Sequence, residues 1–167
     1  MEEKPLKVRF KDFVNKFPEV DLPITLGEET HHIFSQQNPP IPAAMIEQFI
    51  LPLEDETEVD ELTEFVACFR LPAEKEYTAL VYWKAGLLSY QYRLVTFGKD
   101  EKPIDSRVIG GTYYDGEQLT QSVATVQENG QVIIASGQEA PGGGSFEASK
   151  STAYRVQIGT KGKIVNL

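Results

Sequence analysis

The feature of the sequence that most constrains its fold is a pair of strand-like runs, residues 77–84 and 87–97, on either side of Ala85-Gly86. A two-residue loop is the commonest connection of a β-hairpin, and it would pair Trp83 with Leu88 and Ala79 with Tyr92. Because side chains alternate between the two faces of a strand, one face of this hairpin collects a largely apolar and aromatic set: Tyr77, Ala79, Val81, Trp83, Leu88, Tyr90, Tyr92 and Leu94. We therefore predict an antiparallel hairpin with this face buried.

Further strands are expected on both sides of the hairpin, at residues 65–71, 104–109, 121–128, 131–136, 154–158 and 163–166. Asn129-Gly130 is a strong hairpin signal, since both central residues of a type I′ turn need positive φ. With the two runs above, the chain contains roughly eight strands at the spacing typical of an antiparallel meander. We expect a curved or barrel-like sheet.

The first third of the chain has a different pattern. Apolar residues at helical spacing between Leu6 and Phe17 predict a helix that Pro18 ends, and residues 43–51 predict a second short helix. The segment between them, residues 18–42, is expected to be extended or turning because of its prolines and Gly27. We predict one α+β, mostly β domain over residues 1–167, with an N-terminal segment (1–63) packed on an antiparallel sheet (64–167).

The charge is unevenly distributed. The chain has 16 Lys and Arg against 25 Asp and Glu, a net charge of −9, yet there is no Lys or Arg between Phe17 and Phe69. Such a balance argues against nucleic-acid binding and against docking on anionic membranes. Residues 54–64 hold seven carboxylates in eleven positions without the Gly or Asn that usually bends a calcium loop. We expect a solvated connection there, and a basic partner is the alternative.

Few residues carry recognisable chemistry, and we expect no metal site and no cofactor. His31 and His32 are the only histidines, and adjacent strand residues point to opposite faces, so they are poorly placed to share a metal. A triad with Asp21, Asp55 or Asp105, or a metal site with Glu28 or Glu29, is the hypothesis they leave open. Cys68 is the single cysteine and is interpreted as a small buried hydrophobe. The run 142–145, Gly-Gly-Gly-Ser, lacks the Lys-Ser/Thr of a phosphate loop and is expected to lie in a surface loop.

The aromatic side chains of the hairpin are the best candidates for a binding site: Tyr77, Trp83, Tyr90 and Tyr92. They are interpreted as core packing or as the lining of a small-ligand or sugar site. We therefore favour a non-enzymatic binding or interaction module, for an unknown small ligand or protein. The alternatives are a hydrolase or metal-dependent enzyme using His31 or His32 with nearby carboxylates, and a purely structural protein.

Several short motifs resemble small uncharacterised proteins and lipoproteins of the Bacteroidetes: Phe17-Pro18, Leu22-Pro23-Ile24, Ile41-Pro42 ahead of Phe49-Ile50, the run 92–100, Pro103-Ile104-Asp105 and residues 162–165. The resemblance implies a meander of hairpins behind short N-terminal helices, and it carries no known activity. Members commonly bear a lipoprotein leader with its cysteine, which this sequence does not show. The expected location is the cytoplasm for the sequence as written, or the cell envelope or periplasm if a leader has been removed.

Overall fold

A computed structural model describes residues 7–87, 89–114, 116–138 and 151–167. Over these residues the chain forms one nine-stranded sheet, and every strand pair is antiparallel. The strands are β1 (Ile24–Leu26), β2 (Glu64–Arg70), β3 (Tyr77–Ala85), β4 (Ser89–Gly98), β5 (Pro103–Tyr114), β6 (Leu119–Val126), β7 (Gln131–Gln138), β8 (Thr152–Ile158) and β9 (Ile164–Asn166). They follow chain order from β2 to β9, as a meander does, and the described sheet is open rather than closed into a barrel.

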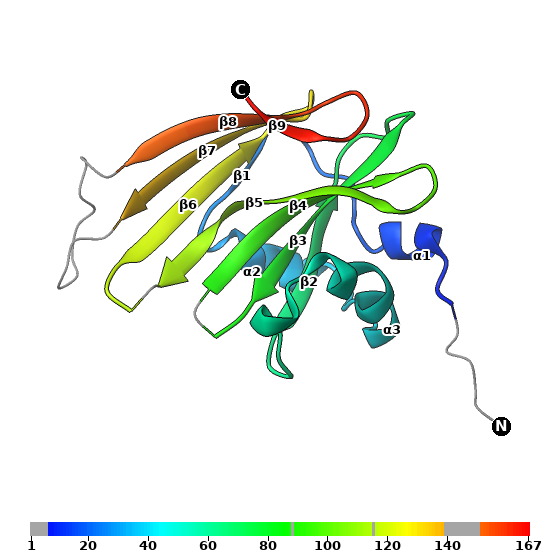
Figure 1. The fold of residues 1–167 in the computed structure, drawn as a ribbon, viewed down its shortest axis with the longest axis horizontal. Coiled ribbons are helices and arrows are strands. Elements are labelled where there is room, and N and C mark those ends of the chain that lie inside the picture. Colours follow the sequence, from blue (N-terminus) through cyan, green and yellow to red (C-terminus); the bar gives the residue numbers. More distant parts are fainter. Residues whose placement is uncertain (1–6, 88, 115, 139–150) are drawn as a thin grey trace.

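Short helices precede β2: α1 (Phe10–Val14), α2 (Thr30–Gln37) and α3 (Ala43–Met45), which continues into a π-helical turn η1 (Ile46–Ile50) and 3₁₀ turns η2 (Leu51–Leu53) and η3 (Glu56–Glu58). Figure 1 shows α1 and α3 beside the β2–β4 part of the sheet, and β6, β7 and β8 fanning away from it. Among the described residues, no helix is long and apolar enough to cross a membrane. The mostly β fold with a few short N-terminal helices is as predicted.

The β2–β4 part of the sheet is buried on both faces. On β3, Val81 and Trp83 belong to a core that also contains Leu26 of β1 and Phe34 of α2. The alternate residues Leu80 and Tyr82 belong to a second core, which also contains the phenylalanines of α1 and residues of α3 and η1. The predicted alternation of β3 is therefore confirmed, but the face opposite the aromatic set is covered as well.

The predicted register of the hairpin is wrong, whereas its faces are right. Trp83 pairs with Tyr92, four positions beyond the expected Leu88, and Ala85 pairs with Tyr90. The turn lies two positions further along the chain than predicted, because β3 continues through Ala85 and the Gly86 amide donates a hydrogen bond to the Ser89 carbonyl at 2.9 Å. A slide by an even number of residues leaves every side chain on its original face, since the period of a strand is two.

Two elements of the segment expected to be extended or turning differ from the prediction. Residues 30–37 form α2, and residues 24–26 form β1, which pairs with the 124–126 end of β6. Strand β5 pairs with β6 only over residues 111–114, so β1 lies along a part of β6 that β5 leaves free. The surface loop expected around residues 142–145 lies outside the described residues.

Candidate functional site

The four aromatic residues singled out from the sequence do not form one site. Trp83 lies with Tyr92 at a ring-centroid distance of 4.6 Å and with Tyr90 at 5.9 Å, the latter pair being nearly parallel at 3°. Tyr77 is six residues away along β3, opposite Gly98. At about 3.3 Å per residue this separation is roughly 20 Å. The structure therefore brings three of the four together and places Tyr77 at the other end of the strand.

The ring cluster of Trp83, Tyr90 and Tyr92 lies mostly within the hydrophobic core, and it contacts the first turn of α2 and the residues just before it. The His31 ring stacks on Trp83 at 4.2 Å and 7°, and the Tyr92 hydroxyl donates a hydrogen bond to the Gly27 carbonyl at 3.0 Å. Trp83 is 5% exposed and Tyr92 1%, whereas Tyr90 is 46% exposed. The cavity beside Trp83 and Tyr92 measures about 30 Å³, which is room for about one water molecule.

The histidines lie next to this cluster, a proximity that nothing in the sequence signalled. Burial, with a contribution from neighbouring His32, lowers the pKa of His31. His32 faces the Glu29 carboxylate at 3.3 Å, and both of these side chains are exposed. Within the described part of the chain, no three His, Cys, Asp or Glu side chains are grouped so that they could hold a metal ion.

Two of the aspartates considered as triad partners have other roles. Asp55 accepts hydrogen bonds from the Thr57 amide and hydroxyl, and Asp105 accepts one from the Ile164 amide at 2.8 Å. Cys68 is fully buried, and burial raises the pKa of its thiol, which keeps the sulfur in its unreactive protonated form.

Tyr77 lines the groove with the largest volume among those described, at about 570 Å³. We call it the Tyr77 groove. Its walls come from three connections, those between β2 and β3, β6 and β7, and β8 and β9. Its polar side chains are those of Glu74, Lys75, Glu76, Asn129, Gln157 and Thr160. The ring, amide, carboxylate and hydroxyl groups in this groove are the kinds of group that bind small polar molecules.

Two of the groove's side chains are held in place. The Gln157 amide nitrogen donates to the Asn129 carbonyl at 2.8 Å and to the Ile158 carbonyl at 3.2 Å, which fixes the orientation of the amide group. Tyr77 packs against Gly162, where φ is +91° and an added Cβ would lie 3.1 Å from the Tyr77 Cβ. Burial, and to a lesser extent the Glu74 carboxylate, raises the pKa of the Tyr77 hydroxyl, so this group stays a hydrogen-bond donor.

Sequence reasoning identified Tyr77 but missed its neighbours in the groove. Asn129 was recognised only as a turn residue, and Gln157 only as part of a strand. A groove assembled from three connections depends on how the two ends of the sheet approach each other, which no local pattern encodes.

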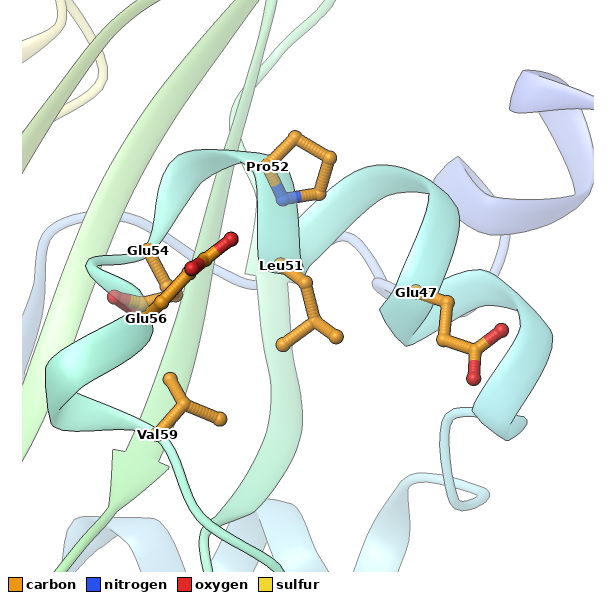
Figure 2. A pocket seen from close by; sticks show the side chains of 6 residues that line it. All are labelled: Glu47, Leu51, Pro52, Glu54, Glu56 and Val59. Carbon is orange, nitrogen blue, oxygen red and sulfur yellow. The ribbon is translucent and has the colours of Figure 1, made fainter.

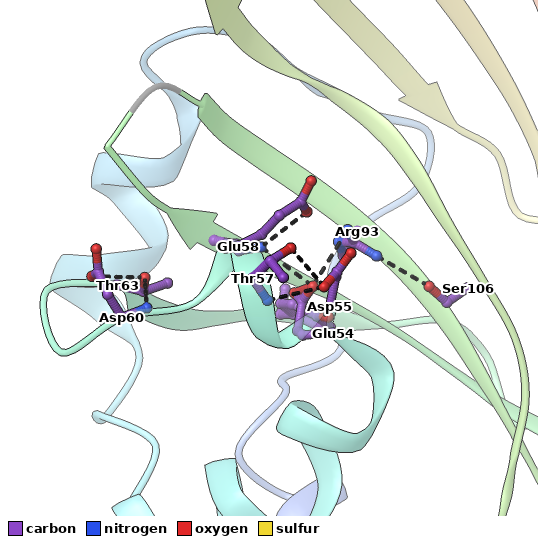
Figure 3. Close-up of polar contacts among 10 residues, drawn as sticks. Glu54, Asp55, Thr57, Glu58, Asp60, Thr63, Arg93 and Ser106 are labelled. Carbon is purple, nitrogen blue, oxygen red and sulfur yellow. Dashed lines mark hydrogen bonds and ion pairs between the residues drawn. The ribbon is translucent and has the colours of Figure 1, made fainter.

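The acidic run contains a buried charge, which corrects the expectation of a fully solvated connection. The Glu54 side chain is 1% exposed and that of Lys84 2%. Glu54 accepts a hydrogen bond from the Tyr82 hydroxyl at 3.0 Å, and its other oxygen lies 3.4 Å from Lys84 Nζ and 3.3 Å from Arg93 Nη2 (Figure 3). Glu54 is buried because two cations and a tyrosine hydroxyl on β3 and β4 compensate its desolvation.

A second groove, of about 420 Å³, lies over this segment and is lined by Glu47, Leu51, Pro52, Glu54, Glu56 and Val59. Figure 2 shows that the carboxylates of Glu47, Glu54 and Glu56 point in different directions. They do not converge on a common point, so this groove lacks the geometry of a cation site.

Compared with protein-family models, curated proteins and solved structures, the chain matches none of them. Its function is therefore inferred from the geometry alone.

Proposed function

We propose that this protein is a non-enzymatic binding module that holds a small polar ligand in the Tyr77 groove. The observation that carries the proposal is the groove itself: at about 570 Å³ it combines an aromatic ring with an amide held by two backbone carbonyls. Pockets for small molecules usually measure 300–1,000 Å³ and combine aromatic surface with a few placed polar groups.

The ligand class that fits these groups is a hydroxylated ring such as a sugar. The ring of a sugar packs its apolar C–H face on an aromatic side chain. Its hydroxyl groups exchange hydrogen bonds with amides, carboxylates and hydroxyls, which Gln157, Glu74 and Thr160 provide here. An acyl chain would leave these polar groups without partners, at a cost in affinity.

Binding without catalysis is favoured by the residues of this groove. Its lining contains neither histidine nor cysteine, and one of its carboxylates, Glu76, lies 3.6 Å from Lys99 Nζ in an ion pair. The ring cluster is the second place for a ligand, since Tyr90 is exposed there, but the cavity beside Trp83 is far smaller.

The test is a panel of mono- and disaccharides screened by thermal shift and measured by calorimetry. Thr160→Arg places a long side chain at the exposed edge of the Tyr77 groove without touching the core, and Thr152→Arg is the matched control on β8, outside the groove. We expect a sugar that stabilises the wild type and the control, and whose affinity falls at least about tenfold in Thr160→Arg, since a buried ligand contact is worth a factor of that order.

Two results would contradict the proposal. A ligand whose affinity is unchanged by Thr160→Arg but lost in Tyr90→Ala would place the site at the ring cluster. The absence of any binding across the panel at millimolar concentration would favour the purely structural alternative.

A further inference from the structure

A second surface, independent of the Tyr77 groove, is built by the acidic segment of residues 54–64, which we call the strap. Glu54 fastens the strap to β3 and β4, with Arg93 of β4 visible beside it in Figure 3. The other acidic residues of the strap are exposed. Asp55 accepts a hydrogen bond from the Thr57 amide at 2.9 Å, and Asp60 accepts one from the Leu62 amide at 2.8 Å. These bonds give the strap a defined shape, so it loses little conformational entropy when a partner binds.

A groove of about 320 Å³ separates the strap from the loop between β3 and β4. Val59 and Leu87 lie on its two sides, and Tyr113 of β5 closes it. Leu87 is 84% exposed and Tyr113 53%. Large apolar side chains gathered around one groove are typical of interaction sites rather than of ordinary surface.

The charge of the groove selects the kind of partner. Glu58 and Asp60 line it, and none of the described residues that line it is a Lys or Arg. Lys84 is buried against Glu54, and its Nζ lies 3.7 Å from the exposed carboxylate of Glu58. The surface is therefore apolar with a negative rim, and a complementary partner is apolar with positive charges.

We propose that the strap groove docks a basic segment of a protein partner, in which apolar side chains meet Leu87 and Tyr113 while Lys or Arg side chains meet Glu58 and Asp60. A second copy of this chain is a poorer occupant, because it would bring the same negative rim against the first.

The proposal is tested with three twelve-residue peptides that alternate Lys with Leu, Gln with Leu, and Lys with Ser. We expect the Lys/Leu peptide to bind the full chain at least about tenfold more tightly than the others, and to weaken as salt rises. The Leu87→Ser variant should reduce this affinity about tenfold, whereas Leu167→Ser, at another exposed leucine, should not.

The charges are tested by a double variant, Glu58→Gln with Asp60→Asn, which keeps the oxygen that accepts the Leu62 amide. Removing these two negative charges at the edge of the groove should lower the affinity for the Lys/Leu peptide about fivefold. The matched control is Glu101→Gln with Glu128→Gln, two exposed carboxylates outside the strap.

Any of three results overturns the proposal. Equal affinity of wild type and Leu87→Ser would show that the peptide does not use the groove. Equal loss in the charge variant and its control would show attraction to the overall charge alone. A concentration-dependent dimer in light scattering that Leu87→Ser abolishes would make a second copy the occupant.

Discussion

Replacing Glu54 with Gln should be among the most destabilising polar substitutions in this protein. The substitution keeps the size of the side chain but removes the one buried carboxylate that faces Lys84 Nζ at 3.4 Å and Arg93 Nη2 at 3.3 Å. Lys84 is 2% exposed, so its charge cannot turn to water, and Glu58, at 3.7 Å and exposed, is left as its remaining carboxylate partner among the described residues. Breaking a buried pair by removing one partner costs about 3–5 kcal/mol.

The free energy of unfolding, measured by urea denaturation, should therefore fall by about 3–5 kcal/mol in Glu54→Gln. The midpoint of thermal unfolding should fall by roughly 10 °C for a chain of this length. Glu56→Gln is the matched control, since this neighbouring carboxylate is exposed, and it should leave the stability unchanged.

A double-mutant cycle isolates the pair itself. Lys84→Met in the Glu54→Gln background removes one of the two cations that lost the Glu54 carboxylate, so the double variant should be more stable than Glu54→Gln alone. Ordinary surface substitutions change the free energy of unfolding by about 0.5 kcal/mol or less. If the free energy of unfolding of Glu54→Gln differs from that of the wild type by no more than this, Glu54 does not fasten the strap and the reasoning is refuted.

Three further predictions concern His31, a pair of glycines and Cys68. Burial lowers the pKa of His31, so near this pKa the unfolded chain binds more protons than the folded one, and the free energy of unfolding should fall as the pH drops below about 6.5. Urea denaturation at several pH values should show a smaller fall in His31→Phe than in the wild type. An equal fall in both proteins would contradict this prediction. Gly111→Ala should cost more than about 3 kcal/mol, since a Cβ there overlaps the Tyr90 carbonyl at a φ of +127°; Gly116→Ala, at φ +100° with open space around it, should cost about 1 kcal/mol in the same denaturation assay. Cys68 should resist a thiol reagent such as iodoacetamide in the native protein and react after unfolding, and rapid native labelling would show that it is not buried.

The parts of the fold that follow from local patterns could be predicted. Alternation in residues 77–84 identified both faces of β3, and Asn129-Gly130 identified the β6–β7 hairpin. The hairpin register could not be predicted, because registers that differ by an even number of residues place the same side chains on the same faces, so the alternation does not distinguish between them. Strand β1 has three residues and α2 has a single buried side chain, Phe34, so neither carries enough periodicity to detect.

The candidate sites were only partly predictable for a different reason. The burial of Glu54 depends on Lys84 and Arg93, which are 30 and 39 positions away in the chain. The Tyr77 groove likewise needs Asn129 and Gln157 from other connections. Such groups are assembled by tertiary packing, and a sequence read segment by segment contains no signal for them.

The most direct test of the proposed binding function is a map of amide chemical shifts in ¹⁵N-labelled protein on addition of a sugar that stabilises it. We predict that the largest shifts fall on Tyr77, Asn129 and Gln157, that Trp83 fluorescence stays nearly constant, and that the shifts vanish in Thr160→Arg. Shifts centred on Trp83 and Tyr90 with an intact response in Thr160→Arg would contradict the account.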